Sequence, residues 1–97
     1  MSRHFEAING NFHRAAEHLS RVAIRSPDAT QVELARVDLS RVANAYRGDG
    51  TEHVPNIITA TTNLARMLQA LSDPAARAAW QEVEEARMMI IDSTRHL

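Results

Sequence analysis

The chain has 97 residues, of which 44% are hydrophobic and 24% are charged, and its formal net charge is −1. This length and this balance are typical of one ordered domain, so we expect residues 1–97 to form a single helical-bundle domain. The absence of cysteine excludes disulfides, thiolate metal sites and a cysteine nucleophile.

The first predicted helix covers residues 3–24, with Ser2 as its N-cap. Its apolar residues recur in alternating steps of three and four, which places them on one helix face. The segment Asn9-Gly10-Asn11 interrupts this pattern with three poor helix formers. Because the stripe continues on both sides, we expect the helix to run through the interruption rather than to begin again there. The stripe consists of Phe5, Ile8, Phe12, Ala15, Leu19 and Val22.

The second predicted helix covers residues 27–47. Ser26 is its expected N-cap, Pro27 takes the first helical position, and Asp28 adds negative charge at the positive end of the helix dipole. Gly48-Asp49-Gly50 is a turn sequence that supplies a glycine C-cap. The buried stripe of this helix is Val32, Ala35, Leu39, Val42 and Tyr46.

The third predicted helix covers residues 54–71 and tolerates Pro55 in its first turn. Three β-branched residues, Thr59, Thr61 and Thr62, lower its helix propensity and leave a short strand over residues 56–62 as the alternative. No partner strand is evident, so we expect a helix. Its stripe is Ile57, Ala60, Leu64, Met67 and Leu71.

The fourth predicted helix covers residues 74–94, with Asp73 as N-cap and Pro74 at the first helical position. Leu71-Ser72-Asp73-Pro74, followed by Arg77 and Trp80, resembles the start of the last helix in J-domain co-chaperones, where Leu-Ser-Asp-Pro precedes an Arg and an aromatic residue. The defining His-Pro-Asp tripeptide of those proteins is absent from the chain. The same stretch is similar to the turn between the helices of type III secretion needle subunits, where an Asp-Pro turn precedes an Ala and an aromatic-Gln pair, here Trp80-Gln81. Both resemblances imply a good helix start, and neither assigns a family. The stripe is Ala76, Ala79, Val83, Ala86 and Ile90.

Four helices joined by short connections predict an all-α fold, an antiparallel up-and-down bundle of helices 3–24, 27–47, 54–71 and 74–94. Short connections make consecutive helices run in opposite directions. The alternating three- and four-residue steps favour left-handed packing of the four stripes around one core.

The sequence contains few residue patterns that indicate metal binding or catalysis. His13 with Glu17, and Asp92 with His96, have the spacing of two metal ligands on one helix face, but solvated side chains are the favoured interpretation. The sequence contains no Gly-x-Ser-x-Gly motif and no phosphate-binding glycine loop. We therefore expect a protein that is not an enzyme, with no cofactor and no bound metal.

The densest acidic cluster is Glu82, Glu84 and Glu85 on the fourth helix. Glu84 has Arg87 three residues further on, so an exposed face with pairing inside the helix is the favoured interpretation. An acidic docking patch for an arginine-rich surface is the alternative. Residues 1–47 carry seven Arg and five acidic residues, and residues 48–97 carry four Arg and seven acidic residues. This small asymmetry of charge suits self-association or contact with a charged partner, but it selects neither.

Surplus apolar residues are the most informative feature for function. The second and fourth helices carry apolar side chains outside their main stripes, which indicates either a wide core or a second contact surface. We expect a non-enzymatic interaction module that acts as an adaptor, chaperone or regulator of a protein partner and that self-associates as a homodimer. Its interface would be built from these residues and rimmed by Arg and Glu. In that interface Met88→Glu would break the assembly. The residues expected to form this interface are Leu34, Val37, Met88, Met89 and Ile91.

The alternative function is a nucleic-acid-associated regulator that uses arginines of the first two helices as an anion or partner contact. The near-zero net charge and the acidic residues among these arginines argue against it. The candidate residues are Arg14, Arg21, Arg25, Arg36 and Arg41.

The expected setting is a bacterial cytoplasm. All eleven basic residues other than histidine are Arg, which is typical of a GC-rich genome. No apolar run is long enough to span a bilayer, and the N-terminal residues lack the apolar core of a signal peptide. We expect no membrane contact.

Overall fold

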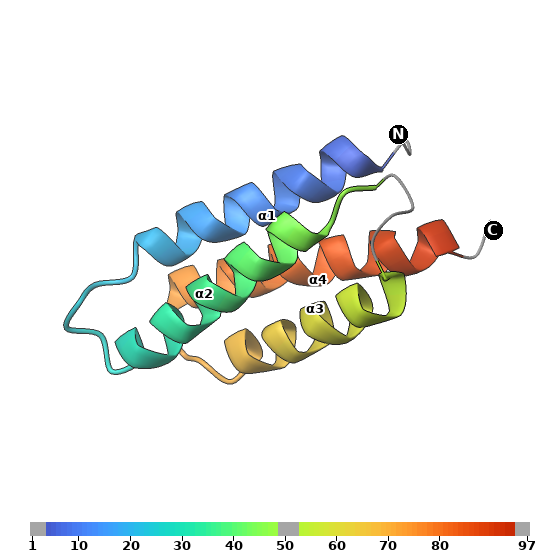
Figure 1. Ribbon diagram of the computed structural model, residues 1–97. Helices are drawn as coiled ribbons and strands as arrows, with labels where there is room; N and C mark the ends of the chain where they lie inside the picture. Colours follow the sequence, from blue (N-terminus) through green and yellow to red (C-terminus); the bar gives the residue numbers. More distant parts are fainter. Residues whose placement is uncertain (1–3, 49–52, 95–97) are drawn as a thin grey trace.

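A computed structural model describes residues 4–48 and 53–94. It contains four helices packed into one antiparallel bundle (Figure 1), and no strand lies within the described residues. The helices are α1 (Phe5–Ser20), α2 (Ala29–Ala45), α3 (Val54–Gln69) and α4 (Pro74–Thr94). The molecule measures 44 × 20 × 18 Å. The predicted all-α four-helix bundle is confirmed.

The four predicted stripes form the core. All of their members are buried except four that are partly buried, and those four pack against the buried ones. Burial of a continuous stripe from each helix removes apolar surface from water, and this is the main force that holds the bundle together. The partly buried members are Phe5, Val22, Ala60 and Met67, with Ile58 and Trp80 packing beside the stripes.

The first helix runs through Asn9-Gly10-Asn11, as predicted. Asn11 is fully buried, and its Oδ1 accepts a hydrogen bond from Arg14. The Nδ2 of Asn11 has no hydrogen-bond partner among the described residues. Continuity of the helix on both sides offsets the low helix propensity of the three residues, because Ile8 and Phe12 bury their side chains in the same core.

The connection between α1 and α2 differs from the prediction. Helix α1 ends at Ser20, and α2 begins at Ala29 with Asp28, not Ser26, at the N-cap position. The Ser26 hydroxyl oxygen instead accepts a hydrogen bond from the Asp28 backbone N–H at 3.2 Å. This local bond holds residues 26–28 in a turn, so Pro27 stays outside the helix.

Asp28 joins the two connections at one end of the bundle. Its carboxylate accepts hydrogen bonds from the backbone N–H groups of Ser72 at 3.2 Å and Asp73 at 3.1 Å. It makes no side-chain bond to its own helix. The Asp28 carboxylate therefore satisfies donors at the start of α4 and ties the α1–α2 connection to the α3–α4 connection.

The starts of the later helices agree with the prediction. Asp73 accepts a hydrogen bond from the Ala75 N–H at 2.9 Å, and α4 begins at Pro74. Residues 56–62 are helical, not extended. The hydroxyls of Thr59, Thr61 and Thr62 donate to backbone carbonyls one turn earlier, which keeps these β-branched residues compatible with the helix.

Gly48 lies after the end of α2 with a φ of +69°. The C-cap residue is Tyr46, so Gly48 does not cap the helix directly as the sequence suggested. A Cβ atom on Gly48 would lie 2.3 Å from Cδ2 of Phe5, whose ring stacks on Tyr46 at a centroid distance of 5.7 Å. Glycine is needed here for both the backbone conformation and the space. The rest of the predicted turn, and the Ser2 cap, lie outside the described residues.

Candidate functional site

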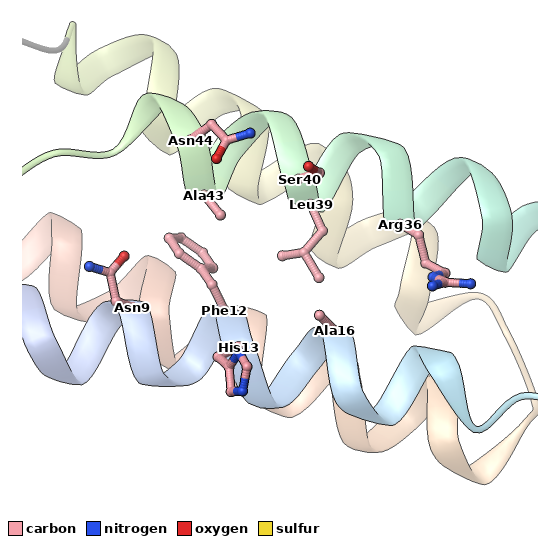
Figure 2. Close-up of a pocket in the computed structure, with 9 residues that line it drawn as sticks. All are labelled: Asn9, Phe12, His13, Ala16, Arg36, Leu39, Ser40, Ala43 and Asn44. Atoms are coloured by element: carbon pink, nitrogen blue, oxygen red, sulfur yellow. The ribbon is translucent and has the colours of Figure 1, made fainter.

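The four helices pack unevenly, and this leaves a groove. Helix α1 packs most closely against α4, α4 against α3, and α3 against α2, whereas α1 and α2 make the fewest contacts of these neighbouring pairs. The space between α1 and α2 is a surface hollow of about 420 Å³ (Figure 2). A second hollow of about 220 Å³ continues the groove beyond Arg36 towards Ile24.

The groove has an apolar floor and a polar rim. Phe12 from α1 and Leu39 from α2 point into the space between the two helices (Figure 2), and each is 2% exposed. The rim carries uncharged polar groups together with one histidine and one arginine. Such a surface matches the apolar face of an amphipathic helix better than it matches a small ligand, because it is open and shallow. The rim residues are Asn9, His13, Arg36, Ser40 and Asn44.

The outer face of α2 exposes two of the predicted interface residues. Leu34 is 56% exposed and Val37 is 45% exposed. Charged residues flank them: the Arg36 guanidinium lies 3.5 Å from the Glu33 carboxylate, and Arg41 has no ion pair with any described residue. Three of the four large hydrophobic side chains exposed within the described residues, namely Ile24, Leu34 and Val37, belong to the α1–α2 connection and α2.

The other predicted interface residues lie on α4. Met88 is 54% exposed, while Met89 and Ile91 are partly buried. Helices α2 and α4 each pack against α1 and α3, so they lie diagonally across the bundle. Their outer faces point away from each other. The structure therefore places Leu34 and Val37 on one surface and Met88 on another.

The five predicted arginines are spread over the molecule. Arg14 lies against α4, where its Nε is 2.9 Å from the Glu82 carboxylate. Arg36 lines the α1–α2 groove, and Arg41 lines a shallow hollow between α2 and α3. Arg21 and Arg25 lie in the connection after α1. These positions do not form one continuous basic surface.

The predicted acidic cluster is divided between two sides of α4. Glu82 pairs with Arg14 across the α1–α4 contact, whereas Glu84 accepts two hydrogen bonds from Arg87, one of them at 3.0 Å from Nε. These hydrogen bonds lower the pKa of Glu84 and raise the pKa of Arg87, against the opposing effect of partial burial. Glu85 remains exposed.

The histidine–carboxylate pairs are surface features where they can be described. His13 Nε2 lies 3.2 Å from Glu17 Oε1, and both side chains are exposed. His96 lies outside the described residues. Within residues 4–48 and 53–94, no three side chains of metal-binding type come together.

Sequence reasoning did not find the α1–α2 groove. Periodicity shows which face of each helix is buried, but not how closely two helices approach. The small residues Ala16 and Ala43 on the facing sides of α1 and α2 are the one sequence signal for a shallow hollow at this place.

Comparison of the chain with known protein families, characterised proteins and solved structures finds no match. In the part of the chain that the structure describes, no helix has the length and apolar character to cross a membrane. Inferences about function therefore rest on the surfaces described above.

Proposed function

We propose that this chain is a small, non-enzymatic protein-interaction module that binds other helices, its own second copy among them, through the outer face of α2 and the adjoining groove. The observation that carries the proposal is the exposure of Leu34 and Val37 on a helix whose opposite face is fully used by the core. The proposal is also supported by the charged side chains at both ends of this apolar pair, Glu33 before it and Arg41 after it.

The energetics favour contact of this face with another helix. Fully burying a Val or Leu side chain contributes roughly 1.5–3 kcal/mol, and about half of that remains available from Leu34 and Val37 because they are 56% and 45% exposed. A partner helix that covers both side chains also gains contacts in the α1–α2 groove. This is the helix-in-groove mode of recognition.

The test is the absolute mass in solution, measured by light scattering after size exclusion over a concentration series. We expect the wild-type mass to rise from 10.8 kDa towards a multiple of it. Leu34→Glu places a charge in the contact, so we expect this variant to stay monomeric with unchanged helicity by circular dichroism. A wild-type chain that remains monomeric at every concentration contradicts the self-association.

Met88→Glu is the matched control on α4. The sequence pattern alone assigned Met88 to the same interface, but the structure places it diagonally opposite to α2. We therefore expect Met88→Glu to assemble like the wild type. If Met88→Glu dissociates the assembly and Leu34→Glu does not, the interaction surface is α4 rather than α2.

A further inference from the structure

We infer that the second copy packs its own α2 antiparallel against α2, about a two-fold axis that passes close to Val37. This inference rests on the proposed function and specifies the partner and the register of the contact. It follows from the positions of apolar and charged residues along the outer face of α2.

The outer face of α2 is a single stripe centred on Val37. Each of its residues lies three or four positions from another member of the stripe, and this spacing places all of them on one side of a helix. All of them are exposed, whereas Ala35, Leu39 and Val42 on the opposite side are buried. The stripe residues are Thr30, Glu33, Leu34, Val37, Arg41 and Asn44.

The charges on this stripe are self-complementary only in the antiparallel arrangement. Glu33 precedes Val37 by four residues, and Arg41 follows it by four. A two-fold axis at Val37 sets Glu33 of each copy opposite Arg41 of the other, and it sets Thr30 opposite Asn44. A parallel pair in register would bring like charges together, Glu33 on Glu33 and Arg41 on Arg41. Charge therefore favours the antiparallel pair.

These charged side chains are available for the contact. Among the described residues, Arg41 makes no ion pair, and Glu33 pairs only with Arg36 of its own helix, in an exposed contact of 3.5 Å. The aliphatic part of Arg41 from the second copy would also cover Leu34. Both large apolar side chains that α2 exposes, Leu34 and Val37, are thus buried by the same arrangement.

The arrangement predicts a closed dimer of modest affinity. A two-fold contact uses the same surface on both copies, so assembly stops at two chains. One helix pair buries an area at the low end of the range for specific interfaces, so we expect dissociation on dilution.

The absence of cysteine allows a direct test by cross-linking. Val37→Cys places two thiols next to the axis, within reach of an intermolecular disulfide. Under mild oxidation we expect this variant to run as a covalent dimer on a non-reducing gel, and much sooner than Met88→Cys. Met88 is similarly exposed, at 54% against 45%, but lies away from the contact. Equal rates of cross-linking for the two variants would overturn the inferred axis.

Charge reversal tests the register. Glu33→Arg and Arg41→Glu each remove two ion pairs and create like-charge contacts, so we expect either change to weaken dimerisation by about tenfold. The double variant restores opposite charges and should return the affinity close to the wild-type value. Glu17→Arg makes the same change of charge on the exposed side of α1 and should have little effect.

The results of these experiments distinguish a failure of the inferred two-fold pairing from a failure of the proposed function. If Leu34→Glu dissociates the assembly but the double reversal does not restore affinity, the interaction face stands and the two-fold register is wrong. If assembly is lost with Ala16→Arg in the groove and unaffected by Val37→Glu, the inferred pairing is likewise wrong and the groove is the contact. A strictly monomeric wild-type chain overturns both.

Discussion

At the scale of single residues, burial follows helical position closely enough to be predicted for most of the chain. The exceptions are polar residues inside the core. Asn11 and Thr61 are both fully buried. The Thr61 hydroxyl donates a hydrogen bond within its own helix, but the Asn11 amide nitrogen has no partner in the part of the chain that the structure describes. Periodicity marks a position as buried, but it does not show whether a polar group there will find a partner.

Leu39 tests the core assignment. It is 2% exposed and packs between α1 and α2. We expect Leu39→Ala to lower the free energy of unfolding by about 2–5 kcal/mol, because the cavity that it leaves adds to the lost burial. Urea unfolding provides the measurement. Gln31→Ala, at an exposed position of the same helix outside the proposed contact, serves as the control and should change stability by less than about 0.5 kcal/mol.

Two glycines should respond in opposite directions to the same substitution. In Gly48→Ala the alanine must adopt a left-handed backbone conformation, and its Cβ atom clashes with Phe5. We therefore expect the free energy of unfolding to fall by more than about 1 kcal/mol. Gly10→Ala lies inside α1, where the added methyl group meets only the movable end of Arg14 at 3.1 Å. We expect it to stabilise the helix by about 0.5–1 kcal/mol. Thermal unfolding of both variants checks the signs.

The pair Glu84–Arg87 predicts a dependence of stability on pH. Because hydrogen bonds from Arg87 lower the pKa of Glu84 in the folded chain, the pair stabilises the fold fully above the ordinary glutamate pKa of about 4.3. This contribution is lost as the pH falls through the lowered folded value. The difference in unfolding free energy between wild type and Glu84→Gln should therefore shrink between about pH 6 and about pH 3. Glu85→Gln, at an exposed neighbouring position, is the matched control.

At the scale of helices and connections, the existence of each helix could be predicted, but its ends only in part. The start of α4 follows from Asp73 and Pro74 because all of its contacts are local. The start of α2 does not, because Asp28 binds the backbone of Ser72 and Asp73 in another connection. A helix end that depends on a contact with residues far away in the sequence cannot be predicted from local helix propensity.

Asp28→Ala tests this contact between connections. It removes the acceptor for two backbone N–H groups, so we expect a loss of about 1–2 kcal/mol in the free energy of unfolding. The loss should exceed that of Ser26→Ala, although local sequence preference alone makes Ser26 the more important cap. Denaturant unfolding of the two single variants decides between them, and an equal or larger effect of Ser26→Ala would contradict the structural assignment.

At the scale of the whole molecule, the proposed self-association should appear in thermal unfolding. A partner that binds only the folded chain raises the apparent stability, so the Tm of the wild type should increase with protein concentration. Leu34→Glu should have a Tm that does not depend on concentration. A wild-type Tm that is constant over a hundredfold range of concentration would contradict the proposed function.

The sequence by itself determined the all-α class, the four helices and nearly all of the core, because these depend on periodicity and short connections. Only the tertiary structure decided the spacing of the helices, and with it the groove between α1 and α2. It also placed Met88 diagonally opposite to Leu34 and Val37 and dispersed the five arginines. The physical reason is that a side chain's exposure is set within its own helix, whereas a shared surface depends on how several helices lie together.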